Sequence, residues 1–435
     1  MDPILTGLIG LGAMFLMIIL HIPIGIAMGL TGLVGVAAII GWGPAVSLLG
    51  TEPSSAIANE GLAVLALFLL MGAFAGAGGL SADIYRMAYS LVGHWRGGLC
   101  MATVGGCAGF GAVCGSSVAT TATMARIALP EMLNRGYRPT LASGVIAAGG
   151  TLGMLIPPSV VMILYGILTE QFVIALFAAA IIPGLLTVAF YFATIAIYVR
   201  ISPDAGPAGP RVPWAKRLVV VGESWRVIVL AIVVSGGIYS GVFTVTEAAA
   251  VGASLAFIFT ALRGKLNRRS FLNCLGETAA NTGLIFTIII GASIFSYFVT
   301  LSQLPGAVVD NIEALNLHPL LVILLLQIMY LILGSIFDTI AAMVITLPFV
   351  YPLVVGMGFD PIWWGVVNVM VMEIGMITPP IGINVFVLHG MAKDLPLKTI
   401  FTGITPFFIA DLCRLAVVTL FPSLALWLPQ YWGLL

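Results

Sequence analysis

The sequence predicts an all-α polytopic membrane protein built from two inverted repeats. Hydrophobic residues make up 60% of the 435 residues and charged residues 8%, whereas a soluble protein carries roughly 25% charge. The mean hydropathy is +1.15, and apolar stretches near the length of about 20 residues that a bilayer requires recur along the chain. A pair of helix-breaking motifs also occurs twice, once in each half, which indicates an internal repeat.

The first repeat is expected at residues 1–199. Residues 4–20, 22–40, 61–80 and 171–199 are apolar and long enough to be spans, and 81–96 is polar and amphipathic. The segment at about 97–135 is apolar with Gly115-Ser116-Ser117 at its middle, which predicts a helical hairpin. The segment at about 140–168 is a span that Pro157-Pro158 interrupts, because proline removes a backbone N–H and clashes with the preceding turn.

Residues 200–226 contain Pro, Gly, Arg and Lys and predict a cytoplasmic linker, after which the pattern restarts. The second repeat, 227–435, is expected to hold spans at 227–243, 246–262, 275–301 and 404–428 and an amphipathic stretch at 303–317. A second hairpin is expected at about 318–355 and a second broken helix at about 361–390. The two copies share G-S-x-x-x-T-x-A, at Gly115–Ala122 and Gly334–Ala341, and a later G-M-x-x-P-P.

The distribution of Lys and Arg predicts on which side of the membrane each loop lies. If each hairpin enters and leaves on one side, each repeat has five crossings, one of them broken, and the second repeat is therefore inverted. With the N-terminus outside, the basic residues of the loops fall in the inner segments, and the outer segments contain no Lys or Arg. If both hairpins spanned the membrane, the basic segments 200–226 and 263–270 would lie outside, so the re-entrant arrangement is preferred.

Composition also excludes several functions. Net charge is zero, so no nucleic-acid partner is expected. Gly264-Lys265 is followed by Leu266, which does not fit the phosphate-binding loop of ATPases, and we expect no ATP site. The four His have no zinc-binding spacing, and the sequence shows no nucleophile–base pair, so an enzyme is not expected. Cys100, Cys107 and Cys114 recur every seven residues and are interpreted as packing residues.

The hydroxyls and the carbonyls freed at the breaks are hard oxygen ligands, which suit a cation such as Na⁺. Asp338 lies beside the second tip, where a carboxylate inside a membrane is a functional candidate, and cation binding is favoured over a structural role. Glu373, before the second break, fits a structural and a functional role equally. Asp411 and Arg414 lie three residues apart, and a structural ion pair is favoured over a substrate anchor.

These motifs resemble the large membrane (permease) subunit of tripartite ATP-independent periplasmic (TRAP) transporters, within the ion-transporter superfamily of elevator proteins. The resemblance rests on Gly115–Ser117, Gly150–Ser159, Pro183-Gly184 and Gly375–Asn384, and it covers nearly the whole chain. It implies a Na⁺-driven importer of small organic acids in a bacterial inner membrane. A periplasmic substrate-binding protein would deliver the carboxylate, and a small four-helix membrane subunit would brace this one. A transport domain holding both hairpins and both broken helices would move as an elevator against a scaffold.

The resemblance also implies one Na⁺ site between each tip and the break of its own repeat. The candidate Na⁺ ligands are Gly115, Ser116, Gly150, Gly153 and Pro157 in the first repeat, and Gly334, Ser335, Asp338, Thr339, Gly375, Thr378, Pro379 and Asn384 in the second. The candidate substrate-binding residues are Ser116, Ser117, Thr151, Ser159 and Asn384. A stand-alone Na⁺/dicarboxylate symporter is the alternative, separable by whether transport requires a binding protein, and a channel is a third possibility.

Overall fold

The computed structural model describes residues 2–315 and 317–435, so Asn316 of the expected stretch 303–317 lies outside the described residues. The described chain is helical and contains no strand. The helices of the first half are α1 (Pro3–Ile19), α2 (Ile24–Ile40), α3 (Trp42–Ala58), α4 (Glu60–Ala77), α5 (Leu80–Val92), α6 (Gly98–Cys114), α7 (Ser117–Asn134), α8 (Pro139–Leu155), α9 (Val160–Leu168) and α10 (Val173–Ile201).

The segment between the halves holds the short helix η1 (Pro203–Ala205) and α11 (Trp214–Glu223). The helices of the second half are α12 (Trp225–Ala231), the π-helical turn η2 (Ile232–Gly236), α13 (Gly237–Tyr239), α14 (Val245–Leu262), α15 (Arg268–Leu301), α16 (Leu304–Ala314), α17 (Pro319–Ile336), α18 (Thr339–Gly356), α19 (Pro361–Gly375), α20 (Ile383–Met391), α21 (Leu397–Leu420) and α22 (Ser423–Tyr431). Among the described residues, eight helical segments are long and apolar enough to cross a membrane, or nine if the bent pair at 214–239 is counted.

The element order repeats as the motifs predict. Each half has a short amphipathic helix (α5, α16), then two helices joined by two residues (α6 and α7, α17 and α18) and a pair separated at Pro-Pro (α8 and α9, α19 and α20). A long helix, α10 or α21, follows. The first hairpin begins and ends within one residue of the predicted range 97–135, because glycine and capping residues define its ends locally.

Four segments differ from the expectation. The span expected at 275–301 begins earlier, at Arg268 of α15. Residues 41–60, which connect the spans expected at 22–40 and 61–80, form α3. The last span, expected at 404–428, begins at Leu397 and ends at Leu420, since Pro396 precedes its first turn and Pro422 ends it. The linker 200–226 contains α11 and packs on neighbouring helix ends: the N–H of Arg138 donates to the carbonyl of Ala205 at 3.0 Å.

Helices of the two halves interleave. α2 packs along α15, and α4 packs along α14. The close contact between α2 and α15 requires glycine. A Cβ on Gly25 would lie 2.5 Å from the carbonyl oxygen of Thr287, and a Cβ on Gly32 would lie 2.7 Å from the nitrogen of Phe295. We call α1, α2, α4, α14 and α15 the scaffold group. The G-x-x-x-G spacing that begins at Gly25 therefore brings together helices of this one chain.

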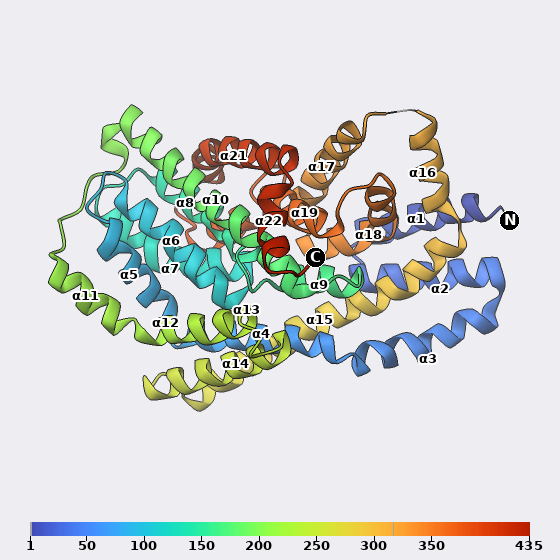
Figure 1. Ribbon diagram of the computed structural model, residues 1–435, viewed down its shortest axis with the longest axis horizontal. Helices are drawn as coiled ribbons and strands as arrows, with labels where there is room; N and C mark the ends of the chain where they lie inside the picture. The colour runs from blue at the N-terminus through green and yellow to red at the C-terminus, as the bar shows by residue number, and fades with distance from the viewer. Residues whose placement is uncertain (1, 316) are drawn as a thin grey trace.

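A second set of helices surrounds the two motif pairs. α8 packs on α6, α7 and α21, and α20 packs on both α7 and α8, so the second broken helix contacts the first hairpin. α19 packs on α17 and α10. We call α6–α10 and α17–α21 the hairpin group. In Figure 1, α6, α7, α8 and α10 lie above and to the left of α4, α14 and α15, and the N-terminus lies at the end of the molecule opposite to α5 and α11.

Candidate functional site

The two hairpin tips are short and capped by their own side chains. At the first tip, Gly115 takes a left-handed conformation (φ 62°), and the Ser116 hydroxyl accepts a hydrogen bond from the N–H of Ala119 at 3.3 Å, capping α7. At the second tip, the Asp338 carboxylate accepts from the N–H of Ile340 at 3.1 Å, capping α18. Asp338 is partly buried, and cation binding there stays a prediction.

The first tip lies against the break in the first broken helix. A Cβ on Gly150 would lie 1.8 Å from the Thr121 hydroxyl, and a Cβ on Gly153 would lie 2.7 Å from the Ser116 carbonyl oxygen. Gly115 approaches the other side of the break, where its Cβ would lie 3.2 Å from the carbonyl oxygen of Pro158. The structure thus brings Gly115, Ser116, Gly150 and Gly153 together, with Pro157 in the connection between α8 and α9.

The second tip lies against the second break in the same way. A Cβ on Gly375 would lie 2.7 Å from the Cα of Gly334, and the N–H of Gly382 donates to the Ser335 carbonyl at 3.1 Å. The Thr339 hydroxyl donates to the sulfur of Met376 at 3.2 Å. Gly334, Ser335, Thr339 and Gly375 are therefore neighbours.

Thr378 and Pro379 face a different space. They line a cavity of about 300 Å³ between the break and α21, together with Phe401 and Phe408. The Thr378 hydroxyl donates to the carbonyl of Ile374 at 2.5 Å. Their part in a cation site stays a prediction.

Asn384 connects the two halves of the site. Its amide Nδ2 donates to the hydroxyl of Ser117 at 2.7 Å and to the carbonyl of Ala147 at 3.3 Å, and both Asn384 and Ser117 are fully buried. Its Oδ1 has no hydrogen-bond partner among the described residues. A buried amide oxygen without a donor is suited to a cation or to a ligand N–H. Two candidates chosen from different repeats are thus in direct contact.

Thr151 and Ser159 are also buried but satisfied locally. The Thr151 hydroxyl donates to the carbonyl of Ala148 at 2.7 Å and lies 3.4 Å from the Tyr191 hydroxyl of α10. The Ser159 hydroxyl accepts from the N–H of Met162 at 3.4 Å and caps α9. Their role in substrate binding stays a prediction.

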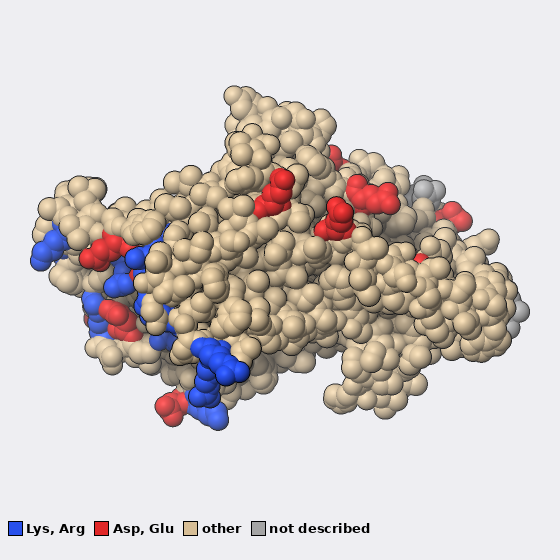
Figure 2. Space-filling view, turned by 90° about the horizontal axis from the view of Figure 1, so that it is seen from below, with Lys and Arg blue, Asp and Glu red and all other residues tan. Residues whose placement is uncertain are grey.

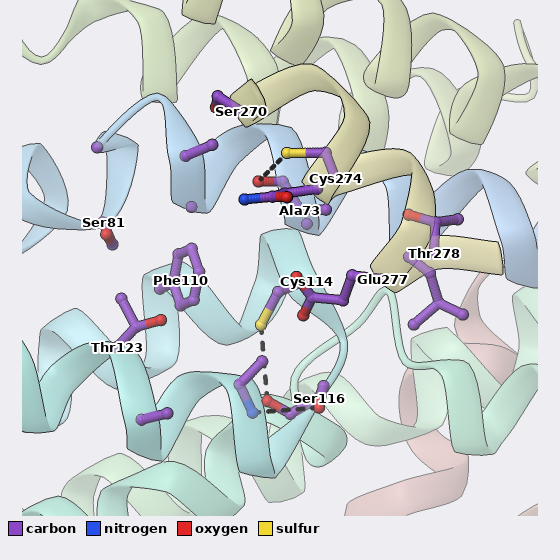
Figure 3. Close-up of a pocket in the computed structure, with 18 of the residues that line it drawn as sticks. Ala73, Ser81, Phe110, Cys114, Ser116, Thr123, Ser270, Cys274, Glu277 and Thr278 are labelled. Atoms are coloured by element: carbon purple, nitrogen blue, oxygen red, sulfur yellow. Dashed lines mark hydrogen bonds between the residues drawn. The ribbon is translucent and has the colours of Figure 1, made fainter. Parts of the chain in front are cut away.

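A cavity of about 740 Å³ lies beside the first tip, between α4, α6, α7 and the first turns of α15. Figure 3 shows Ser116, Cys114 and Phe110 on one side and Cys274, Glu277 and Thr278 of α15 on the other. The sequence analysis missed Glu277, although an acid three residues into the span expected at 275–301 was a visible signal.

A buried group of charges lies behind the breaks, on α19 and α21. The Arg414 Nε donates to Asp411 at 2.7 Å, and Arg414 Nη1 donates to the Thr187 hydroxyl at 2.7 Å, which confirms the expected ion pair. Glu373 lies 3.7 Å from Arg414, and all three charged side chains are 0% exposed. Asp411 also accepts from the Tyr191 hydroxyl at 2.9 Å. These side chains therefore cross-link α10, α19 and α21 inside the hairpin group.

Paired hairpins whose tips lie in the breaks of discontinuous apolar helices define a membrane transporter permease, not an enzyme. Comparison with known families gives the particular class: residues 11–424 match the model of the tripartite ATP-independent periplasmic transporter, DctM component. The chain belongs to this family, whose large permeases work with a small membrane protein and a periplasmic binding protein.

The sequences of known relatives are similar to this one along most of the chain. It is 36% identical over 374 residues to the C4-dicarboxylate TRAP transporter large permease protein DctM of Pseudomonas aeruginosa, covering 86% of this chain and 87% of that one. It is 31% identical to the ectoine/5-hydroxyectoine TRAP transporter large permease protein UehC of Ruegeria pomeroyi, covering 88% and 87%. The crystal structure of the Alcanivorax borkumensis YdaH transporter shares the fold, with a TM-score of 0.63, 15% identity and 90% coverage of each chain.

Proposed function

We propose that this chain couples the entry of Na⁺ to the import of a small organic acid that a periplasmic binding protein delivers, with the small membrane subunit as a further partner. The observation that carries the proposal is the seating of each tip in the break of its own repeat. At both places backbone carbonyls and hydroxyls come together, and such oxygens are the ligands that hard cations prefer. The first site would use Ser116, Gly150 and Gly153.

The second site would use Ser335, Asp338 and Gly375. Asp338 would add a carboxylate, so this site would compensate the charge of Na⁺ better than the first. The Asn384 amide joins the second broken helix to Ser117 at the first tip, and occupation of one site can therefore influence the other. The substrate would bind beside Ser116, which both lines the 740 Å³ cavity and caps α7.

We assign the basic end of the molecule to the cytoplasm. Figure 2 shows Lys and Arg gathered at the end that holds α5 and α11, while the charged side chains visible at the opposite end are acidic. Positive charge favours the cytoplasmic side, which puts the N-terminus in the periplasm of a bacterial inner membrane. The large cavity lies toward this basic end, because its lining includes Gly79 and Arg269. The conformation would then be open to the inside, as an elevator carrier is after delivery.

The experiment is uptake into proteoliposomes that contain this chain with its small subunit, under an inward Na⁺ gradient. Labelled carboxylates are added with and without the cognate binding protein. Uptake that needs both Na⁺ and the binding protein supports the proposal. Na⁺-driven uptake without any binding protein would instead indicate a stand-alone symporter, and uptake that neither saturates nor requires a gradient would indicate a channel.

Matched variants test the sites. Ser116→Ala and Asp338→Asn should each raise the Na⁺ concentration needed for half-maximal uptake by about tenfold, the effect of losing about 1.4 kcal/mol of ion binding. Ser254→Ala on α14 and Asp310→Asn on α16 remove the same groups from exposed positions outside the tips and should change nothing. Unchanged Na⁺ activation in both tip variants would remove the site assignment.

A further inference from the structure

The cavity beside the first tip has a deep part and a mouth. Two contacts through α4 show which part of α15 lies level with the first tip. The Cys274 thiol of α15 donates to the carbonyl of Ala73 at 3.6 Å, and a Cβ on the neighbouring Gly72 would lie 2.9 Å from Cys114. Cys274 therefore lies near the level of the tip, and Glu277, one turn further along α15, lies in the deep part beside it. Figure 3 shows the Glu277 side chain extending from α15 toward Cys114 and Ser116.

Glu277 is the single acid in the lining, and Arg126 and Arg269 are the two bases. Arg126 lies ten residues after Ser116, which is about 15 Å along α7, and Arg269 lies in the first turn of α15. Both bases are thus nearer the mouth. The side chain of Glu277 is exposed to the cavity and takes part in none of the ion pairs between described residues.

The neighbours of Glu277 are polar and uncharged. Thr278, Asn281 and Ser116 line the same deep part, and none of them supplies a positive charge to offset the carboxylate. A carboxylate on a membrane helix is costly unless it faces water or a partner, and here it faces the space in which the substrate would bind. That space already contains a base, Arg126, on the hairpin side.

We propose that this cavity takes a zwitterionic carboxylate: the carboxylate of the ligand faces Arg126 of α7, and its cationic group faces Glu277 of α15. The proposal rests on the proposed function and narrows its substrate class. A dicarboxylate would bring a second negative charge to Glu277, and like charges at contact distance repel strongly where water is partly excluded. The two charged walls belong to different helix groups, α7 to the hairpin group and α15 to the scaffold group.

The test uses a matched pair of ligands. Succinate and 4-aminobutyrate both have four carbons and a carboxylate at one end, and they differ in whether the other end is a second carboxylate or an ammonium group. Binding is measured on the purified complex with its small subunit, as protection of Thr123→Cys against a maleimide. The background is Cys413→Ser with Cys114→Ala and Cys274→Ala, because Cys413 is exposed and the other two of these cysteines line the cavity.

We expect 4-aminobutyrate to protect at concentrations about tenfold lower than succinate, the ratio for a difference of about 1.4 kcal/mol. Glu277→Gln should abolish this preference, and Arg126→Gln should weaken both ligands. Glu223→Gln, an exposed acid at the end of α11, is the control and should leave the preference intact.

Tighter binding of succinate to the unmodified complex, a preference that Glu277→Gln leaves unchanged, or no protection by either ligand at about 1 mM would each overturn the proposal. Na⁺-driven uptake is measured on the same preparation. Na⁺-driven uptake with a preference for succinate refutes only the proposal of a zwitterionic ligand. A preference for 4-aminobutyrate without Na⁺-driven uptake refutes the proposed Na⁺ coupling and leaves the cavity assignment standing.

Discussion

Arg414 provides the sharpest test of how the hairpin group is held together. Its guanidinium donates to Asp411 and Thr187 at 2.7 Å each and lies 3.7 Å from Glu373, and none of the three charged side chains is exposed. Arg414→Met would leave two buried carboxylates without a countercharge. Removing one member of a buried ion pair costs about 3–5 kcal/mol because the remaining charge is neither hydrated nor paired.

The loss of stability caused by unpaired buried charge can be separated from the loss caused by altered side-chain packing. Replacing all three residues, with Glu373→Leu, Asp411→Leu and Arg414→Met together, removes the charges and keeps apolar volume, so most of the loss should be recovered. Arg414→Lys keeps the charge but cannot donate to Asp411 and Thr187 in the same fork geometry, and it should fall between Arg414→Met and the unmodified protein.

The assay is reversible denaturation by SDS in mixed micelles, followed by tryptophan fluorescence, for which the chain has eight Trp. The free energy of unfolding is compared between the single and the triple variants, because their difference isolates the buried charge. A loss below about 1 kcal/mol for Arg414→Met would refute the reasoning, since that value is typical of an ion pair that water already screens. A triple variant less stable than Arg414→Met would also refute it.

Two further predictions concern the tips. Gly150→Ala would place a Cβ 1.8 Å from the Thr121 hydroxyl, so the tip should be displaced at a cost of about 1–3 kcal/mol and Na⁺ activation of uptake should weaken. Gly276→Ala on α15 has nothing within 4 Å and should leave uptake unchanged; equal behaviour of the two variants would contradict the contact. Asn384→Ala removes the donor to Ser117 and should cost about 1 kcal/mol by the same unfolding assay. Asn384→Ala paired with Ser117→Ala should lose less than the sum of the single changes, and strict additivity would argue against the bond.

Local signals were sufficient for the hairpins and the breaks. Glycine, a capping Ser or Asp and Pro-Pro act on the residues next to them, so the ends of α6, α7 and α8 and the start of α19 follow from the sequence within one or two residues. The seating of each tip in its break needed a further step, because it depends on how separate helices pack. The resemblance to TRAP permeases supplied that step, and the contacts of Gly150 and Gly375 agree with it.

Contacts between the repeats could not be predicted in this way. Asn384 and Ser117 are 267 residues apart, and neither residue carries a signal that identifies the other. The same is true of Glu373, which fitted two roles equally until the structure placed it beside Arg414. Glu277 is a different case, since an acid within an expected span was visible. The sequence could not show that the helix carrying Glu277 borders a cavity beside the first tip, where it could equally have packed on another helix.

Backbone-close glycine contacts hold helices together within each group, and one also crosses between the groups, since a Cβ on Gly72 of α4 would lie 2.9 Å from the Cα of Cys114 of α6. Backbone-close contacts join α2 to α15 within the scaffold group, at Gly25 and Gly291, and join α8 to α21 within the hairpin group, at Gly144 and Gly403. Such contacts are hard to slide, because any shift brings a Cβ or a carbonyl into overlap.

The boundary between the groups also contains two cavities. The 740 Å³ cavity lies between α15 and α7, and a second cavity of about 560 Å³ is lined by the far end of α15 and by α18. The two cavities therefore lie at opposite ends of the same scaffold helix, each beside one hairpin. An elevator stroke of the hairpin group along α15 would close the first cavity as it enlarged the second. Paired cysteines, Thr123→Cys with Asn273→Cys and Tyr351→Cys with Ser296→Cys, should then cross-link in opposite states, and cross-linking of both pairs in one state at equal rates would exclude this movement.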